Sequence, residues 1–113
     1  MRTFSDLSAE ERSVIEDLQR RIRDEFPGWA FALTLFGSRA RGEAEPDSDM
    51  DVMVEIRSDR ISLEEKRRLG RLAGDISASS GIVLSLLIAD RETLENRGEL
   101  SILRNIREEG LAL

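Results

Sequence analysis

The apolar residues follow two different periods along the chain, and each period predicts one type of element. Three segments carry apolar residues three and four positions apart, which is the spacing of an amphipathic helix. Ser8 with Glu11, and Ser62 with Glu65, form capping-box patterns that predict two helix starts. A further helix is predicted around residues 101–109. Breaks in the pattern predict the three helix ends at Pro27–Gly28, at Ser79–Gly81 and at Gly110.

Three other runs are rich in apolar and β-branched residues and are bounded by polar ones, as strands are. They cover residues 29–36, 50–56 and 82–88. The first is apolar on both sides, which favours a central position in a sheet. The order helix, strand, strand, helix, strand, helix predicts an α/β (α+β) fold, with a small mixed β-sheet flanked by helices.

The composition limits the chemistry that the chain can perform. Its 113 residues suit a single domain over residues 1–113, and 40% of them are apolar. With neither cysteine nor histidine, the chain lacks disulfides, thiol catalysis, histidine bases and most transition-metal sites. Carboxylate chemistry with hard cations, arginine and lysine chemistry, or binding alone remain. No apolar run approaches the ~20 residues of a membrane span, and the start lacks a signal-peptide pattern, so we expect a cytoplasmic protein without a membrane partner.

The net charge of −6 argues against non-specific binding of phosphate backbones, so no direct nucleic-acid binding is expected. The basic cluster at Lys66–Arg68 and Arg71 is interpreted as the solvated face of a helix.

The segment with the clearest chemistry begins at the end of the first predicted strand. There the chain enters Gly37 and Ser38 and then a short stretch with helical tendency. A glycine lets the backbone approach a ligand closely, and free N–H groups at such a turn bind anions. Arg39 and Arg41 add guanidinium groups that suit phosphate.

Two aspartates, Asp49 and Asp51, stand at the start of the next strand. Residues i and i+2 of a strand point to the same face, with Cα atoms roughly 6.6 Å apart. Two such carboxylates can share one or two Mg²⁺ ions. An EF-hand loop is rejected because Val52 and Ser58 occupy the positions of its glycine and glutamate. A purely structural role as turn formers is less favoured, because carboxylates are disfavoured in strands.

Taken together, Gly37-Ser38-Arg39-Ala40-Arg41-Gly42 and Ser48-Asp49-Met50-Asp51-Val52-Met53-Val54 resemble the signature of the minimal nucleotidyltransferases (MNT), small members of the DNA polymerase beta superfamily. The resemblance spans the whole chain, from the leading helix to the closing segment at residues 105–110.

The resemblance implies a role for each motif residue. Gly37 and Ser38 would hold the triphosphate of ATP, with help from Arg39 or Arg41, and Asp49 and Asp51 would bind Mg²⁺, with two ions expected. AMP would then pass from ATP to a hydroxyl group of a partner protein while pyrophosphate leaves. The expected partner is a HEPN-domain toxin, for which the chain would be the antitoxin.

One feature of the family pattern is missing. Active relatives typically carry a third carboxylate on the neighbouring strand, where this chain offers Ser85. Glu55 lies about 13 Å beyond Asp51 along its strand, and Asp90 is expected to cap the next turn. The alternative hypothesis is therefore an inactive MNT-like protein that neutralises its partner by binding. Transfer to a small molecule such as an aminoglycoside is less favoured, because the chain is too short for an added acceptor domain.

Overall fold

Four strands form one mixed sheet in the order β3-β2-β1-β4. The strands are β1 (Phe31–Phe36), β2 (Met50–Ile56), β3 (Leu84–Ala89) and β4 (Leu111–Ala112). β1 is antiparallel to both β2 and β4, whereas β2 is parallel to β3. The computed structural model describes residues 2–97 and 101–113. The mixed sheet and the central position of β1 confirm the predicted fold class.

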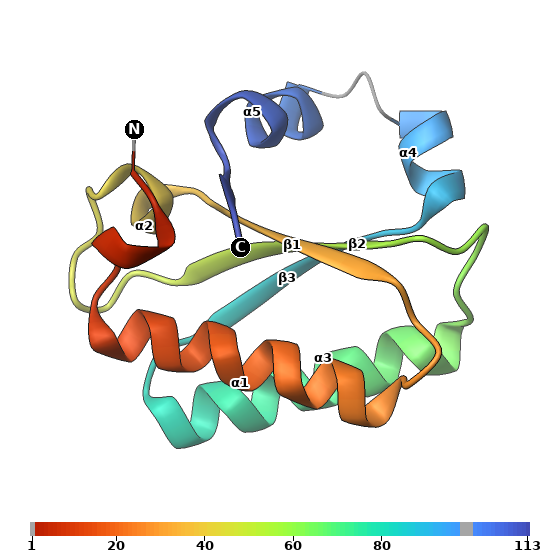
Figure 1. The fold of residues 1–113 in the computed structure, drawn as a ribbon, viewed down its shortest axis with the longest axis horizontal. Coiled ribbons are helices and arrows are strands. Elements are labelled where there is room, and N and C mark those ends of the chain that lie inside the picture. Colours follow the sequence, from red (N-terminus) through yellow and green to blue (C-terminus); the bar gives the residue numbers. More distant parts are fainter. Residues whose placement is uncertain (1, 98–100) are drawn as a thin grey trace.

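Helices cover both faces of the sheet (Figure 1). α1 (Ala9–Glu25) and α3 (Leu63–Ser80) lie side by side on one face, below the sheet in Figure 1. α4 (Arg91–Arg97) and α5 (Ser101–Glu109) lie on the opposite side, and the short elements η1 (Phe4–Asp6) and α2 (Ser38–Arg41) lie near one end. The predicted helix at 101–109 is confirmed.

Both predicted capping boxes are present. Ser8 Oγ accepts the Glu11 N–H at 3.1 Å, and the Ser8 N–H donates to Glu11 Oε1 at 2.9 Å. Ser62 and Glu65 repeat this pair of bonds at 3.1 and 2.8 Å. Each box gives a partner to two backbone N–H groups that would otherwise lack one at a helix start. The starts of α1 and α3 therefore follow from local sequence.

The main core lies between the sheet and the pair α1 and α3. Met50 and Val52, which alternate with the aspartates of β2, are both 0% exposed on this side. Their inward orientation confirms the alternation that the sequence predicted. The helices contribute Val14, Ile15, Leu18 and Ile22 from α1 and Leu69, Leu72, Ala73 and Ile76 from α3.

A smaller core covers the opposite face of the sheet. Met53 and Ala89 pack there against Leu103 and Ile106 of α5. Because side chains alternate along a strand, Asp51 points to the same face as Met53. α5 therefore covers the middle of this face. Asp51 lies on the same face, nearer the start of β2.

Two predicted strands differ from the observed ones at their starts. β1 begins at Phe31, because Trp29 donates its N–H to the Phe26 carbonyl at 3.0 Å and stacks on the Phe26 ring at 3.8 Å. β3 runs from Leu84 to Ala89, because the Ile82 N–H donates to Ser80 Oγ at 3.1 Å in the turn before it. In both places a turn bond occupies residues that had been predicted as strand.

Three elements among the described residues were not predicted: η1, α4 and β4. α4 begins directly after Asp90, whose Oδ1 accepts the Thr93 N–H at 2.9 Å and the Thr93 hydroxyl at 2.7 Å. The expected capping role of Asp90 is thus confirmed, but the helix that it starts is additional. β4 has two residues and pairs with Thr34 and Leu35 of β1, a contact that no local pattern indicates. Among the described residues, no helix has the length and apolar character needed to cross a membrane.

Candidate functional site

The turn after β1 depends on the backbone freedom of Gly37. Its φ of 76° and ψ of −159° belong to a region that side-chain-bearing residues avoid. The Gly37 carbonyl accepts the N–H groups of Ala40 and Arg41 at 3.2 and 3.3 Å, which closes the single turn of α2. The chain thus turns sharply from the sheet into α2, and Ser38 is the first residue of that helix.

Sheet pairing brings Asp51 to this turn. Asp51 lies opposite Phe36 of β1 on one side and Ser85 of β3 on the other. A Cβ atom placed on Gly37 would be only 2.5 Å from Asp51 Oδ2, so the carboxylate occupies the space that the absent side chain leaves. The two halves of the motif, which are distant along the chain, therefore meet.

The second aspartate, Asp49, lies near Asp51 and is exposed to solvent. Asp49 is exposed and directly precedes β2, where the Met50 N–H donates to the Val83 carbonyl at 2.8 Å. Burial raises the pKa of Asp51, and the negative charge of Asp49 raises it further. The two carboxylates are therefore close enough to repel each other.

These carboxylates suit a hard divalent cation. Oxygen donors are the ligands that Mg²⁺ prefers, and a cation would remove the repulsion between Asp49 and Asp51. Within residues 2–97 and 101–113, no three candidate ligand side chains gather at one point. Asp49 and Asp51 are therefore the two carboxylates at this turn that could hold a divalent cation.

The neighbouring strand places Ser85 directly beside Asp51. Ser85 pairs with Asp51 and is exposed, so the expectation that Ser85 occupies the neighbouring-strand position is confirmed. Glu55 lies farther along β2, opposite Ala32 and Ala89. It is therefore separated from Asp51, as the strand spacing predicted.

The two predicted phosphate-binding arginines have different surroundings. Arg39 is 8% exposed, and its guanidinium contacts Glu11 and the Ser48 carbonyl. Arg41 is exposed, and its Nε lies 3.0 Å from Glu43 Oε2. Arg39 thus has protein partners in the structure, and Arg41 is the arginine that a ligand can reach.

Arg41 borders a cavity of about 190 Å³ beside the turn. This cavity is lined by Phe36, Gly37 and Arg41 on one side and by Ile102, Asn105, Ile106 and Glu109 of α5 on the other. A larger cavity of about 480 Å³ lies at the opposite end of β3, near Asp90 and Thr93. We place the candidate site at the smaller cavity, because it is lined by Gly37, against which the Asp51 carboxylate packs; Asp49 and Asp51 themselves do not line it.

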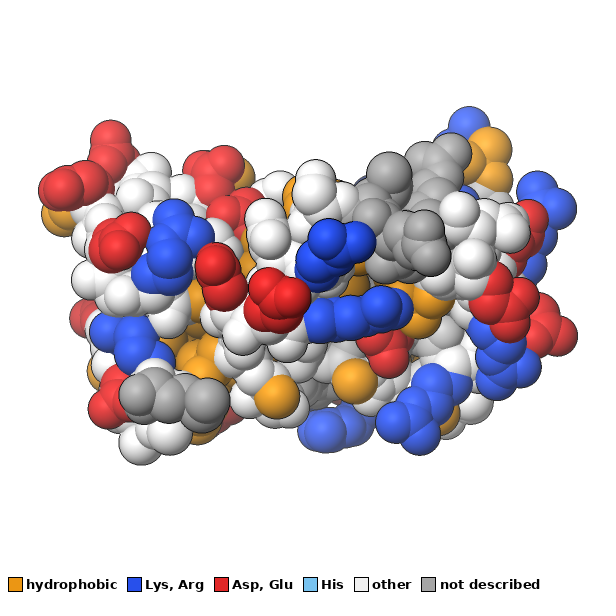
Figure 2. Space-filling model, turned by 90° about the horizontal axis from the view of Figure 1, so that it is seen from above, with side chains coloured by type: hydrophobic (Ala, Val, Ile, Leu, Met, Phe, Trp, Pro, Cys, Tyr) orange, Lys and Arg blue, Asp and Glu red, His pale blue; other side chains and the backbone are white. Residues whose placement is uncertain are grey.

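The face that carries α4 and α5 shows acidic and basic side chains interspersed, with apolar side chains visible between them (Figure 2). Two well-exposed apolar residues lie close to the candidate site. Val83 precedes β3 and is 55% exposed, and Ile102 of α5 is 49% exposed.

Replacing Asp51 by asparagine is expected to raise the melting temperature when no metal is present. The raised pKa of Asp51 means that its charge is less favourable in the folded than in the unfolded chain, so at neutral pH the neutral amide removes a destabilising group. Thermal unfolding at pH 7 with a chelator measures this effect. Asp75→Asn, an exposed acid on α3, is the control. A lower melting temperature for Asp51→Asn than for this control would contradict the interpretation.

The chain is also similar to known proteins. Residues 15–112 match the family model described as nucleotidyltransferase domain, and the chain belongs to that family. A curated relative, named "Putative protein adenylyltransferase MJ0604", comes from Methanocaldococcus jannaschii. It is 24% identical over 105 residues, which cover 91% of this chain and 97% of the relative.

The sequence did not indicate two parts of this site. Glu11 was predicted only as a capping residue, and its contact with Arg39 spans 28 positions of the chain. The wall formed by α5 depends on where that helix packs. The one signal in the sequence for a second role of Glu11 is its place three residues after the capping Ser8, close to the buried side of the helix. That signal is weak.

Proposed function

We propose that this chain is a metal-dependent nucleotidyltransferase that moves AMP from ATP to a hydroxyl group of a partner protein. The observation that carries the proposal is the packing of the Asp51 carboxylate against Gly37, with Asp49 beside it. Membership of the nucleotidyltransferase domain family and the printed name of the relative support the reaction class.

Each motif residue has a place in this proposal. Asp49 and Asp51 would hold Mg²⁺, which would neutralise triphosphate charge. The turn at Gly37 and Ser38 would offer backbone N–H groups and a hydroxyl to phosphate oxygens, and the exposed Arg41 would add a guanidinium. Phosphoryl-group transfer depends mainly on positioning and charge neutralisation, which are what these groups provide.

The proposed transfer needs only ATP and the acceptor hydroxyl group as reactants. The acceptor hydroxyl oxygen forms a bond to the α-phosphorus of ATP, and the bond from that phosphorus to the bridging oxygen breaks. Pyrophosphate carries away the electron pair, and the hydroxyl proton passes to solvent. Solvent is the proton acceptor in this proposal because Ser85, not a carboxylate, lies beside Asp51.

The acceptor in our proposal is a protein of the HEPN toxin class, with this chain as its antitoxin. The support is the resemblance to the MNT antitoxins, together with the words "protein adenylyltransferase" in the name of the relative. Val83 and Ile102 add exposed apolar surface near the site, which suits contact with a protein.

The first test is a calorimetric titration of the protein with ATP, with and without Mg²⁺. We expect binding that requires Mg²⁺ and becomes at least about 100-fold weaker in the double variant Asp49→Asn, Asp51→Asn, because a ligand matters at least as much as an outer-shell residue. Binding by the folded double variant with unchanged affinity would falsify the assignment of the two aspartates.

A second candidate function is neutralisation of the partner by binding alone, and Ser85 in the third-carboxylate position favours it. Toxin inhibition by the double variant separates the two candidates. Loss of inhibition, together with loss of label transfer from ATP to the toxin, supports the transferase. Full inhibition by the double variant supports neutralisation by binding.

A further inference from the structure

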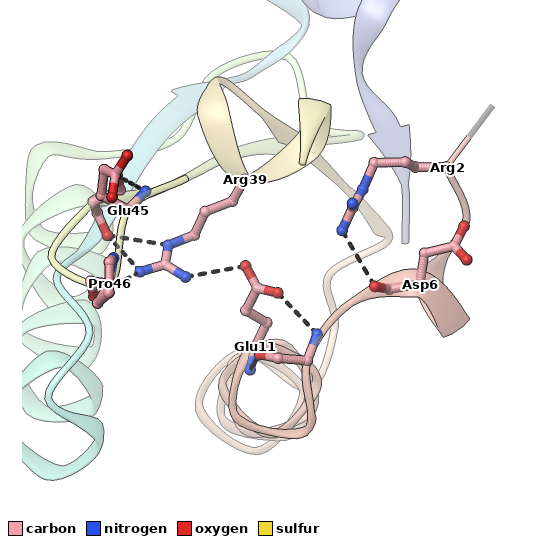
Figure 3. Close-up of polar contacts among 8 residues, drawn as sticks. Arg2, Asp6, Glu11, Arg39, Glu45 and Pro46 are labelled. Carbon is pink, nitrogen blue, oxygen red and sulfur yellow. Dashed lines mark hydrogen bonds and ion pairs between the residues drawn. The ribbon is translucent and has the colours of Figure 1, made fainter. Parts of the chain in front are cut away.

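A buried ion pair lies beneath the candidate site. Arg39 Nη1 is 3.0 Å from Glu11 Oε2, and the two residues are 8% and 7% exposed (Figure 3). Burying two charges removes their hydration, so such a pair is weak support for stability alone. Its partners instead suggest that it has a positioning role.

The other nitrogens of Arg39 hold the loop that leads to Asp49. Nε and Nη2 donate to the Ser48 carbonyl at 3.0 and 2.7 Å. Asp49 follows directly, and the next N–H, that of Met50, is bound to the Val83 carbonyl. The exposed Asp49 therefore stands between two anchored peptide groups, one of which depends on Arg39.

Glu11 is itself fixed in direction. Its Oε1 accepts the Ser8 N–H in the capping box of α1, so Oε2 is the oxygen that faces Arg39. α1 is packed on the sheet through buried residues such as Val14 and Ile15. The carboxylate thus connects Arg39 to one of the most firmly packed helices of the protein.

We propose that Glu11 and Arg39 form a positioning pair that sets the place of Asp49 relative to Asp51 and the turn at Gly37. Arg39 directly follows Ser38, so one side chain ties the phosphate-binding turn, the aspartate loop and α1 together. Neither residue needs to touch a ligand. The effect on metal and nucleotide rests on the proposed function, whereas the effect on the loop does not.

The test compares Glu11→Gln with Glu65→Gln. Both glutamates occupy the third position of a helix and accept the N–H of a capping serine, but only Glu11 is bound by Arg39. The amide keeps the size of the side chain and an oxygen for the capping bond. The control therefore carries the same chemical change without the positioning pair.

Two measurements are made on each variant. Hydrogen–deuterium exchange over residues 43–50 is expected to speed up at least about tenfold in Glu11→Gln and to stay unchanged in Glu65→Gln. Only the former removes the carboxylate that holds Arg39, whose guanidinium binds the Ser48 carbonyl. Calorimetry with ATP and Mg²⁺ is expected to show about 10- to 100-fold weaker binding in Glu11→Gln alone. A residue needed only for overall stability would alter exchange in α1 and α3 as well.

Arg39→Lys provides a second variant that keeps the buried positive charge. One ammonium group cannot span Glu11 and the Ser48 carbonyl as the guanidinium fork does, so we expect faster exchange over residues 43–50 here too. If exchange in this loop is unchanged in folded Glu11→Gln and Arg39→Lys, the proposed positioning role is wrong, whatever the variants' affinity for ATP.

The outcomes separate this inference from the proposed function. If exchange in the loop becomes faster but Mg²⁺–ATP binding is undiminished, the proposal that the loop sets the binding site is overturned. A wild-type protein that binds no ATP overturns the proposed function and that link together, and the exchange data still decide whether the pair holds the loop.

Discussion

Gly37→Ala is expected to weaken Mg²⁺-dependent ATP binding strongly and to lower the free energy of unfolding by about 1–3 kcal/mol. The new Cβ would lie 2.5 Å from Asp51 Oδ2, and the φ of 76° would strain any side-chain-bearing residue. Asp51 must therefore move or the turn must rearrange. Because Asp51 would hold the metal that binds the triphosphate, we expect at least about 100-fold weaker Mg²⁺-dependent nucleotide binding, as for the double aspartate variant.

Calorimetry and urea unfolding measure both effects on the same samples. Gly74→Ala is the matched control, because a Cβ placed at that exposed position of α3 meets nothing within 4 Å. In a helix interior this change should stabilise the protein by about 0.5–1 kcal/mol and leave nucleotide binding unchanged. Wild-type affinity in Gly37→Ala would show that Asp51 does not need its observed position.

Asp90→Ala is expected to lower the free energy of unfolding by about 2–4 kcal/mol at neutral pH. The carboxylate is 3% exposed, caps α4 through Thr93, and accepts the buried Ile61 N–H at 3.1 Å. Losing a helix cap costs about 0.5–2 kcal/mol, and leaving a buried donor without a partner costs about 1–3 kcal/mol. Urea unfolding measures the loss, with Asp75→Ala as an exposed control on α3.

The same carboxylate makes stability depend on pH. Burial acts to raise the pKa of Asp90, but hydrogen bonds from Thr93 and Ile61 and the charge of Lys66 outweigh it and hold the pKa below its ordinary value. The stabilisation is therefore complete above the unfolded-state pKa of about 4 and is lost as the pH falls through the lowered value. The difference between wild type and Asp90→Ala should shrink in acid. A constant difference from pH 7 to pH 2 would contradict this assignment.

Glu11 should also make the folded protein less stable as the pH falls. Burial acts to raise its pKa as well, and the bonds from Ser8 and Arg39 hold the pKa below its ordinary value. The loss of stability of the wild type in acid therefore combines contributions from at least Asp90 and Glu11. The Asp90→Ala variant removes the contribution of Asp90.

Much of the fold could be predicted because its signals are local. A capping box lies within four residues, so the starts of α1 and α3 are read from Ser8 and Ser62. The alternation in β2 predicted that Met50 and Val52 face the core while Asp51 faces the other side. The strand starts at Trp29 and Ile82 were misplaced, because turn hydrogen bonds with Phe26 and Ser80 took precedence over β propensity.

The amino-acid sequence alone indicated α1, α3 and α5, the three main strands and the residues of the motif, because each depends on neighbours within a few positions. The tertiary structure decided which of these residues meet. Sheet register places Ser85 beside Asp51, and packing of α1 brings Glu11 to Arg39, whereas Arg41 lines the candidate cavity. Contacts between distant segments depend on register and helix packing, which no local pattern contains, so the difference between Arg39 and Arg41 became visible only in the folded chain.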